Sequence, residues 1–151
     1  ASFMNFYAEV CIMIIIGVDP GYAIVGIGVV EYVGNKFRTL EYGAITTEAG
    51  TVFADRLKAI YDDLDFLINR WKPDCIALER LFFTSNQKTV IDVAQARGVI
   101  ILCATQRDIP LYEYTPLQVK MAVVGYGRAE KKQVILFTCQ SRERKIMEEL
   151  S

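Results

Sequence analysis

Residues 14–30 read I-I-I-G-V-D-P-G-Y-A-I-V-G-I-G-V-V, and this stretch decides how the rest of the chain is interpreted. An apolar run ends in an acid and a turn, and a second apolar run follows at once, which is the pattern of a β-hairpin. Pro20 and Gly21 supply turn residues, and the β-branched residues on either side favour strands. The pattern therefore predicts the carboxylate of Asp19 at the end of a buried strand. On this stretch alone, a plain Asp-Pro-Gly turn is an equally good interpretation.

The rest of the chain has the pattern of one mixed α/β domain. Turn residues between apolar runs predict a three-stranded meander, and apolar residues spaced four and three apart then predict a helix that Pro73 ends. A capping box, T-P-L-Q at 115–118, begins a further helix that ends at Gly125, and another helix begins at Arg128. The expected strands cover residues 12–18, 24–32, 37–45, 75–78 and 111–114, and the other two expected helices cover 52–71 and 87–107.

A second acid, Glu79, follows the apolar run 75–78, which is typical of a buried parallel strand. We expect the first and fourth strands to be neighbours in the centre of the sheet, so that Asp19 and Glu79 lie side by side at one edge. Two adjacent carboxylates repel each other, and a divalent cation such as Mg²⁺ relieves that repulsion and activates water for phosphoryl transfer. From spacing alone, an ion pair of Glu79 with Arg80 or Lys120 is an equally supported alternative.

The amino-acid composition limits the kinds of catalytic and metal site that the chain can form. The 151 residues include no histidine, which excludes a Ser-His-Asp or Cys-His nucleophilic site and any histidine-ligated metal. The four cysteines are widely spaced and form no Cys-x-x-Cys pair, so we expect buried thiols in a reduced compartment. Residues 116–151 carry seven Lys/Arg and four Asp/Glu, hence +3 against a total of −1. That basic end is compatible with a phosphate-binding face and also with an ordinary solvated helix.

Five segments, in order along the chain, resemble one protein family. They are I-G-V-D-P-G (16–21), G-I-G-V-V (26–30), P-D-C-I-A-L-E-R-L-F-F (73–83), A-Q-A-R-G-V (94–99) and Q-V-K-M-A-V-V-G-Y-G-R-A-E-K-K-Q-V (118–134). Together they look like the RuvC family of crossover junction endodeoxyribonucleases. The resemblance implies a ribonuclease H-like fold, with a mixed five-stranded sheet flanked by helices. It also implies Mg²⁺-dependent nicking of Holliday junctions, with Mn²⁺ as a substitute, in DNA recombination and repair.

The resemblance further implies partners and a compartment. The family acts as a homodimer beside the RuvA and RuvB branch-migration proteins, and A-Q-A-R-G lies on the helix that the family uses for dimerisation. The small residues of that stretch are more often part of a domain's own core. No segment reaches the roughly 18 apolar residues of a membrane span, and residues 1–12 lack the basic start of a signal peptide. We therefore expect a cytoplasmic protein.

Several DNA-contacting residues follow from the same resemblance. Phe82 matches an aromatic residue that stacks on a base at the opened crossover, and Lys120 and Lys131 match lysines near the cut phosphate. We add Arg128 and Lys132 as phosphate contacts because both belong to the basic end of the chain. Core packing for Phe82 and plain solvent exposure for the basic residues are the competing interpretations.

Asp19 and Glu79 match two of the family's catalytic metal ligands, but the end of the chain departs from the family pattern. The family has a last helix with two further aspartates in an Asp-x-x-Asp arrangement, whereas here no aspartate follows Asp108. The glutamates of the tail stand in a different context, and the tail has the look of a truncated or frame-shifted end. Losing ligands weakens metal affinity and geometry. The alternative function is therefore a catalytically impaired junction-binding protein.

The expected domain organisation has three parts. Residues 1–12 form an N-terminal extension, 13–134 the ribonuclease H-like resolvase domain and 135–151 a divergent tail. A sugar-kinase or actin-like ATPase shares the strand-acid-glycine opening. It also needs a second phosphate-binding glycine motif and a second domain, which this sequence lacks.

Overall fold

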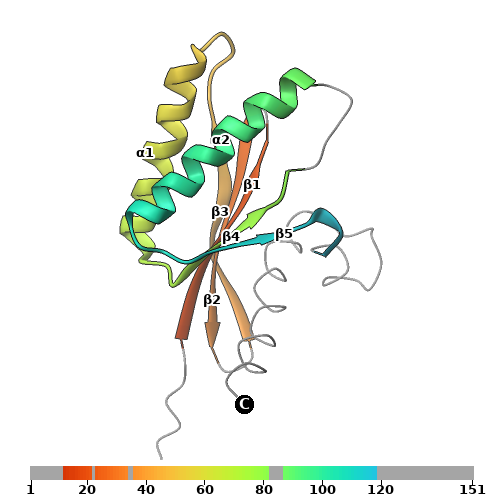
Figure 1. Cartoon of the computed structure of the whole chain (residues 1–151). Helices are drawn as coiled ribbons and strands as arrows, with labels where there is room; N and C mark the ends of the chain where they lie inside the picture. The colour runs from red at the N-terminus through yellow and green to blue at the C-terminus, as the bar shows by residue number, and fades with distance from the viewer. Residues whose placement is uncertain (1–11, 22, 34–35, 82–86, 119–151) are drawn as a thin grey trace, which may run out of the picture.

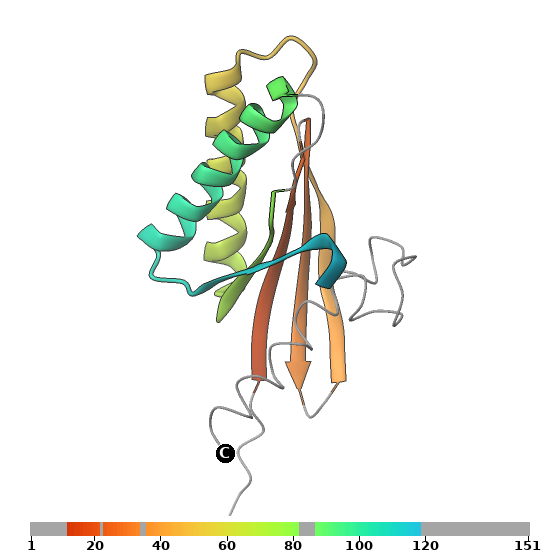
Figure 2. The same cartoon turned by 45° about the vertical axis from the view of Figure 1, so that its right-hand side comes forward.

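The computed structural model describes residues 12–21, 23–33, 36–81 and 87–118 of the chain. Two helices, α1 (Phe53–Trp71) and α2 (Gln87–Gln106), lie on the same side of one sheet (Figure 1; Figure 2). The sheet has the order β3-β2-β1-β4-β5, with β1 (Ile12–Pro20), β2 (Ile24–Val33), β3 (Lys36–Thr46), β4 (Cys75–Glu79) and β5 (Leu111–Tyr114). Each of these elements was expected from the sequence, and each begins and ends within two residues of its predicted bounds.

The sheet combines an antiparallel half with a parallel half. β1, β2 and β3 form the predicted meander, whereas β1 pairs with β4, and β4 with β5, in parallel. β1 is longer than expected, because Asp19 pairs with Gly26 inside the ladder and Pro20 still belongs to the strand. Pro20 was expected in the turn, but its fixed φ also suits extended backbone at a strand end. The turn itself is closed by the Gly21 N–H, which donates to the Ile24 carbonyl oxygen at 3.1 Å.

Asp74 fixes the register between β1 and β4. Its backbone N–H donates to the Ile14 carbonyl oxygen at 2.8 Å, and its Oδ2 accepts the Ile14 N–H at 2.7 Å. These bonds join residues 60 positions apart, and the ladder from Ile15 to Val18 keeps the same offset. The ladder ends at Val18 and Leu78, and the next residues along the two strands are Asp19 and Glu79.

Alternation along the strands divides the core between the two faces of the sheet. The helix-covered face contains Ile16, Val18, Ile76 and Leu78 of the strands, together with Ile60, Leu64 and Ile68 of α1 and Ile100, Cys103 and Ala104 of α2. The second face contains a smaller buried cluster of Ile15, Val30, Cys75 and Ala77. Alternation alone would group Asp19 and Glu79 with Ile15 and Cys75, but both acids lie at strand ends, where they line a pocket that α2 also borders.

The small residues of α2 are divided between core and surface. Ala96 is 4% exposed and packs in the helix-side cluster, whereas Ala94 and Gly98 are exposed. Ile91 and Leu102 of the same helix are 56% and 52% exposed. Because these four outward positions are spaced three and four apart, α2 carries an outer apolar stripe made of Ile91, Ala94, Gly98 and Leu102.

Local predictions can also be compared with the structure. Both bonds of the capping box are present: the Gln118 N–H donates to Thr115 Oγ1 at 3.0 Å, and the Thr115 N–H donates to Gln118 Oε1 at 2.8 Å. Cys75 and Cys103 are buried free thiols, as expected. Within the described ranges, no helix is long and apolar enough to cross a membrane. The predictions for Cys11, Cys139, Gly125 and the helix from Arg128 lie outside the described residues.

Candidate functional site

Asp19 lies near the end of β1, next to a strand position that has no side chain. Its cross-strand partner is Gly26, where an added Cβ would lie 3.5 Å from Asp19 Cβ and 3.9 Å from Asp19 Oδ2. The glycine therefore puts no side chain against the half-buried carboxylate. Any larger residue at this position would narrow the approach to Asp19.

Asp19 and Glu79 line one hollow at the ends of β1 and β4, which we call the carboxylate pocket. Its empty volume is about 550 Å³, part of which is open to solvent. α2 contributes three lining residues from its first half, so the start of this helix borders the pocket. The lining residues are Asp19, Pro20, Glu79, Arg80, Leu81, Thr89, Val90, Val93 and Pro116. The two acids thus meet at one edge of the sheet, as their positions in the sequence predict.

A cluster of charges lies beside the pocket, on the side where β5 pairs with β4. Arg80 Nε lies 3.5 Å from Glu113 Oε2, and Arg97 Nη2 of α2 binds Glu113 Oε1. The Arg80 side chain is 57% exposed, whereas that of Arg97 is 20% exposed. Arg80 was considered as a partner of Glu79 on sequence grounds, and the ion pair seen here joins it to Glu113.

The donor set of the carboxylate pocket suits a hard divalent cation. Asp19 and Glu79 supply carboxylate oxygens from neighbouring strands, whose spacing is about 4.8 Å. Across the described residues, no group of three or more His, Cys, Asp or Glu side chains could hold a metal ion. Mg²⁺ is commonly bound by one or two carboxylates with water and phosphate oxygens completing its shell. Two carboxylates therefore fit this ion.

The residues expected to contact DNA are not placed by the structure. Phe82, Lys120, Arg128, Lys131 and Lys132 all lie outside the described residues. Their roles stay predictions.

Sequence reasoning missed three features of the site. Gly26 opposes Asp19 because of the hairpin register, and counting back from the turn through the two strands would have found it. Thr89 reaches the pocket because α2 crosses the strand ends, for which the sequence carries no local signal. Glu113 lies between two arginines because β5 pairs with β4 and α2 packs over that edge.

Comparison with known proteins identifies the family. The family model of the crossover junction endodeoxyribonuclease RuvC matches residues 15–141. The chain belongs to the RuvC family. The RuvC of Ruminiclostridium cellulolyticum is 57% identical over 122 residues, covering 81% of this chain and 74% of that protein. The RuvC of Clostridioides difficile is 52% identical over 122 residues, covering 81% and 72%.

Solved structures agree with the assignment to RuvC. Thermus thermophilus RuvC in complex with a Holliday junction substrate has a TM-score of 0.73 and 32% identity, covering 83% of this chain and 76% of that chain. A second structure of Thermus thermophilus RuvC has a TM-score of 0.77 and 26% identity, covering 88% and 96%. The yeast mitochondrial Holliday junction resolvase Ydc2, with a TM-score of 0.58 and 12% identity over 85% and 61%, shares the fold. The ribonuclease H-like fold expected from the sequence is therefore confirmed.

Proposed function

We propose that this chain is a structure-specific endonuclease that resolves Holliday junctions by hydrolysing phosphodiester bonds. The observation that carries the proposal is the meeting of Asp19 and Glu79 in one pocket, in a chain that belongs to the RuvC family. The named relatives are crossover junction endodeoxyribonucleases, and one similar structure holds a Holliday junction.

In this proposal Asp19 and Glu79 hold Mg²⁺, with Mn²⁺ as a substitute. When bound there, the cation would act as a Lewis acid and would activate water for attack on phosphorus. Asp19 and Glu79 are kept at a fixed separation by the β1–β4 register that Asp74 sets. Gly26 leaves the approach to Asp19 open to a DNA strand. The protein's own contribution is thus to hold two carboxylates in place at the opening of a partly solvated pocket.

We further propose that residues 13–134 form the resolvase domain and work in the cytoplasm beside the RuvA and RuvB proteins. Phe82 stacks on an unpaired base, an interaction of about 1–3 kcal/mol. The phosphates are bound by Lys120, Arg128, Lys131 and Lys132.

A homodimer formed through α2 is part of the same proposal. The outer apolar stripe of α2 exposes Ile91 and Leu102 with Ala94 and Gly98 between them, and Gly98 has open space around its Cβ position. Small residues between larger apolar ones allow a second helix to approach closely. We expect Leu102→Glu to give a monomer by sedimentation equilibrium. The control Val52→Glu, at a 66% exposed residue before α1, should leave the dimer intact. A monomeric wild-type chain, or a dimeric Leu102→Glu variant, would contradict this part of the proposal.

A second candidate function is a catalytically impaired junction-binding protein. It is favoured by one observation: among the described residues, the pocket is lined by two carboxylates, and no group of three or more possible metal ligands is present. Two metals held by two carboxylates alone would be poorly ligated, so such a chain would bind the junction without cleaving it.

One experiment separates the two functions. A synthetic four-way junction and a duplex of the same sequence are incubated with the chain in Mg²⁺, and binding and nicking are measured on gels. The endonuclease predicts junction nicks that Asp19→Asn and EDTA abolish while junction binding persists. Asp63→Asn, an exposed acid on α1, should nick as the wild type does. Junction binding without nicks would support the second candidate, and no preference for the junction would contradict both.

A further inference from the structure

Arg80 is held at the rim of the carboxylate pocket by its backbone. It directly follows Glu79, it lines the pocket, and its N–H donates to the Tyr114 carbonyl oxygen at 2.7 Å. This bond extends the β4–β5 ladder by one residue, so the root of the side chain is as fixed as the strand. The side chain itself is 57% exposed and so accessible to a ligand.

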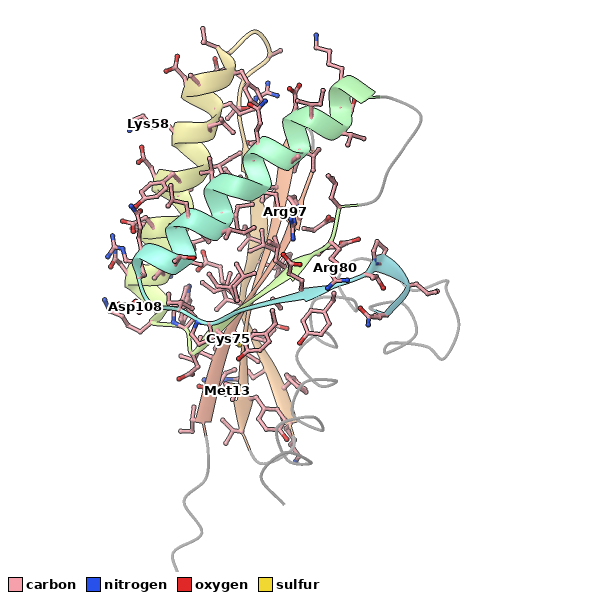
Figure 3. All side chains as sticks on the ribbon, viewed as in Figure 1. Met13, Lys58, Cys75, Arg80, Arg97 and Asp108 are labelled. Atoms are coloured by element: carbon pink, nitrogen blue, oxygen red, sulfur yellow. The ribbon has the colours of Figure 1, made fainter. Side chains whose placement is uncertain are left out.

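Glu113 connects Arg80 to the helix above it. Its Oε2 lies 3.5 Å from Arg80 Nε, and its Oε1 binds Arg97. Figure 3 labels both arginines, Arg97 on α2 and Arg80 just after β4. Because the Arg97 side chain is only 20% exposed, it fixes Glu113, and Glu113 then limits where the Arg80 guanidinium can lie. The contact uses Nε, and a guanidinium carries four more N–H donors on its two Nη atoms.

The two carboxylates make the pocket negatively charged, so binding a DNA phosphate there requires a positively charged side chain. Asp19 and Glu79 together repel a polyanionic strand, and a single divalent cation would only balance them. Of the lining residues in the described part of the chain, Arg80 alone is positively charged. A guanidinium also matches a phosphate in geometry, because it can donate two parallel hydrogen bonds.

We propose that Arg80 binds a phosphate of the DNA strand that enters the carboxylate pocket, and that Glu113 is the positioning residue that aims it. The inference rests on the proposed function, because it takes junction DNA as the substrate. A purely structural Arg80–Glu113 ion pair is the competing explanation, and it predicts no change in how DNA binding depends on salt.

The test is the salt dependence of junction binding. Each lost phosphate contact lowers the slope of log K against log salt by about 1. We expect Arg80→Gln to lower the slope by that amount and to weaken binding about three- to tenfold at low salt, and Arg80→Lys to keep most of the slope. Arg38→Gln is the matched control, because Arg38 is 70% exposed and pairs with Glu31 at 2.9 Å on the opposite edge of the sheet. An Arg80→Gln slope equal to that of Arg38→Gln would overturn the proposal.

A double variant tests the positioning role. Glu113→Gln should weaken junction binding in the wild-type background, relative to the charge-matched control Glu31→Gln. In the Arg80→Gln background it should have little further effect, because the group that it aims is gone. An equal loss in both backgrounds would show that Glu113 acts on the fold and not through Arg80.

Different results test the role of Arg80 and the proposed function. If the wild-type chain binds no junction in preference to duplex, the proposed function fails. If it binds and nicks the junction and Arg80→Gln behaves like Arg38→Gln, only the role of Arg80 fails.

Discussion

Replacing Gly21 by alanine tests how tightly the turn after Asp19 is built. An added Cβ would lie 2.4 Å from the carbonyl oxygen of Ile24, which also accepts the Gly21 N–H at 3.1 Å. Cβ atoms essentially never approach another atom closer than 3.0 Å, so the backbone must move by at least 0.6 Å, the difference between 3.0 and 2.4. Both groups belong to the backbone of one tight turn, so the movement strains or breaks their hydrogen bond.

The expected cost can be worked from these contacts. A lost backbone hydrogen bond costs about 0.5–1.5 kcal/mol, and forcing an extra methyl into packed structure costs about 1–3 kcal/mol. The lower entropy of an unfolded chain with alanine offsets about 0.4–1 kcal/mol. We therefore expect Gly21→Ala to lower the free energy of unfolding by about 2 kcal/mol. At about 2–4 °C per kcal/mol, the melting temperature should fall by about 4–8 °C.

Two other glycines provide matched controls in the same thermal melt, followed by circular dichroism. A Cβ at Gly43 would have nothing within 4 Å, so Gly43→Ala should melt at or above the wild-type temperature. A Cβ at Gly26 would make ordinary contacts of 3.5–3.9 Å with Asp19, so Gly26→Ala should fold normally. Equal melting temperatures for Gly21→Ala and Gly43→Ala would refute the steric reasoning.

Three further predictions concern stability. Asp74→Ala removes the acceptor of the Ile14 N–H and should lower the urea midpoint by the equivalent of about 1–2 kcal/mol. A decrease no larger than that caused by the control Asp63→Ala would contradict the role of Asp74 in fixing the register. Lys72 ends α1 in the left-handed conformation, with φ 47°, which is unfavourable for a residue that has a Cβ. Lys72→Gly should therefore relieve backbone strain and raise the melting temperature, and a lower melting temperature would argue against strain there. Burial raises the pKa of the Cys103 thiol from 9.0 to about 11. The unfolded chain loses this proton first, so the stability of the wild type relative to Cys103→Ala should fall as pH rises from about 9 to about 11, and a constant difference in urea midpoint would contradict this.

Most of the fold follows from local sequence signals. Alternating apolar runs, the helical spacing from Phe53 to Trp71, and Pro73 each place an element, and the capping box of Thr115 and Gln118 forms as its residues predict. Such signals work because they depend on backbone preferences that neighbouring residues share.

The site was only partly predictable, because it depends on register and packing. Asp19 and Glu79 could be placed at strand ends, and their meeting follows once β1 and β4 are neighbours. The ion pairs of Glu113 required the position of β5 and the packing of α2 above it, which no local pattern encodes. The sequence pattern predicted Pro20 in the turn, whereas it belongs to β1, because turn residues do not show where the preceding strand ends.

The two-carboxylate metal site is tested by the rate of junction nicking in Mg²⁺ by the wild type, Asp19→Asn, Glu79→Gln and the double variant. If both carboxylates hold one catalytic metal site, each single change should lower the rate at least about a hundredfold, or ~2.7 kcal/mol. The double variant should lose little more, because groups that act as a unit are not additive. Three results would show that Asp19 and Glu79 do not form one catalytic metal site: a wild-type rate in either single variant, losses that multiply in the double variant, or a wild-type chain that does not nick.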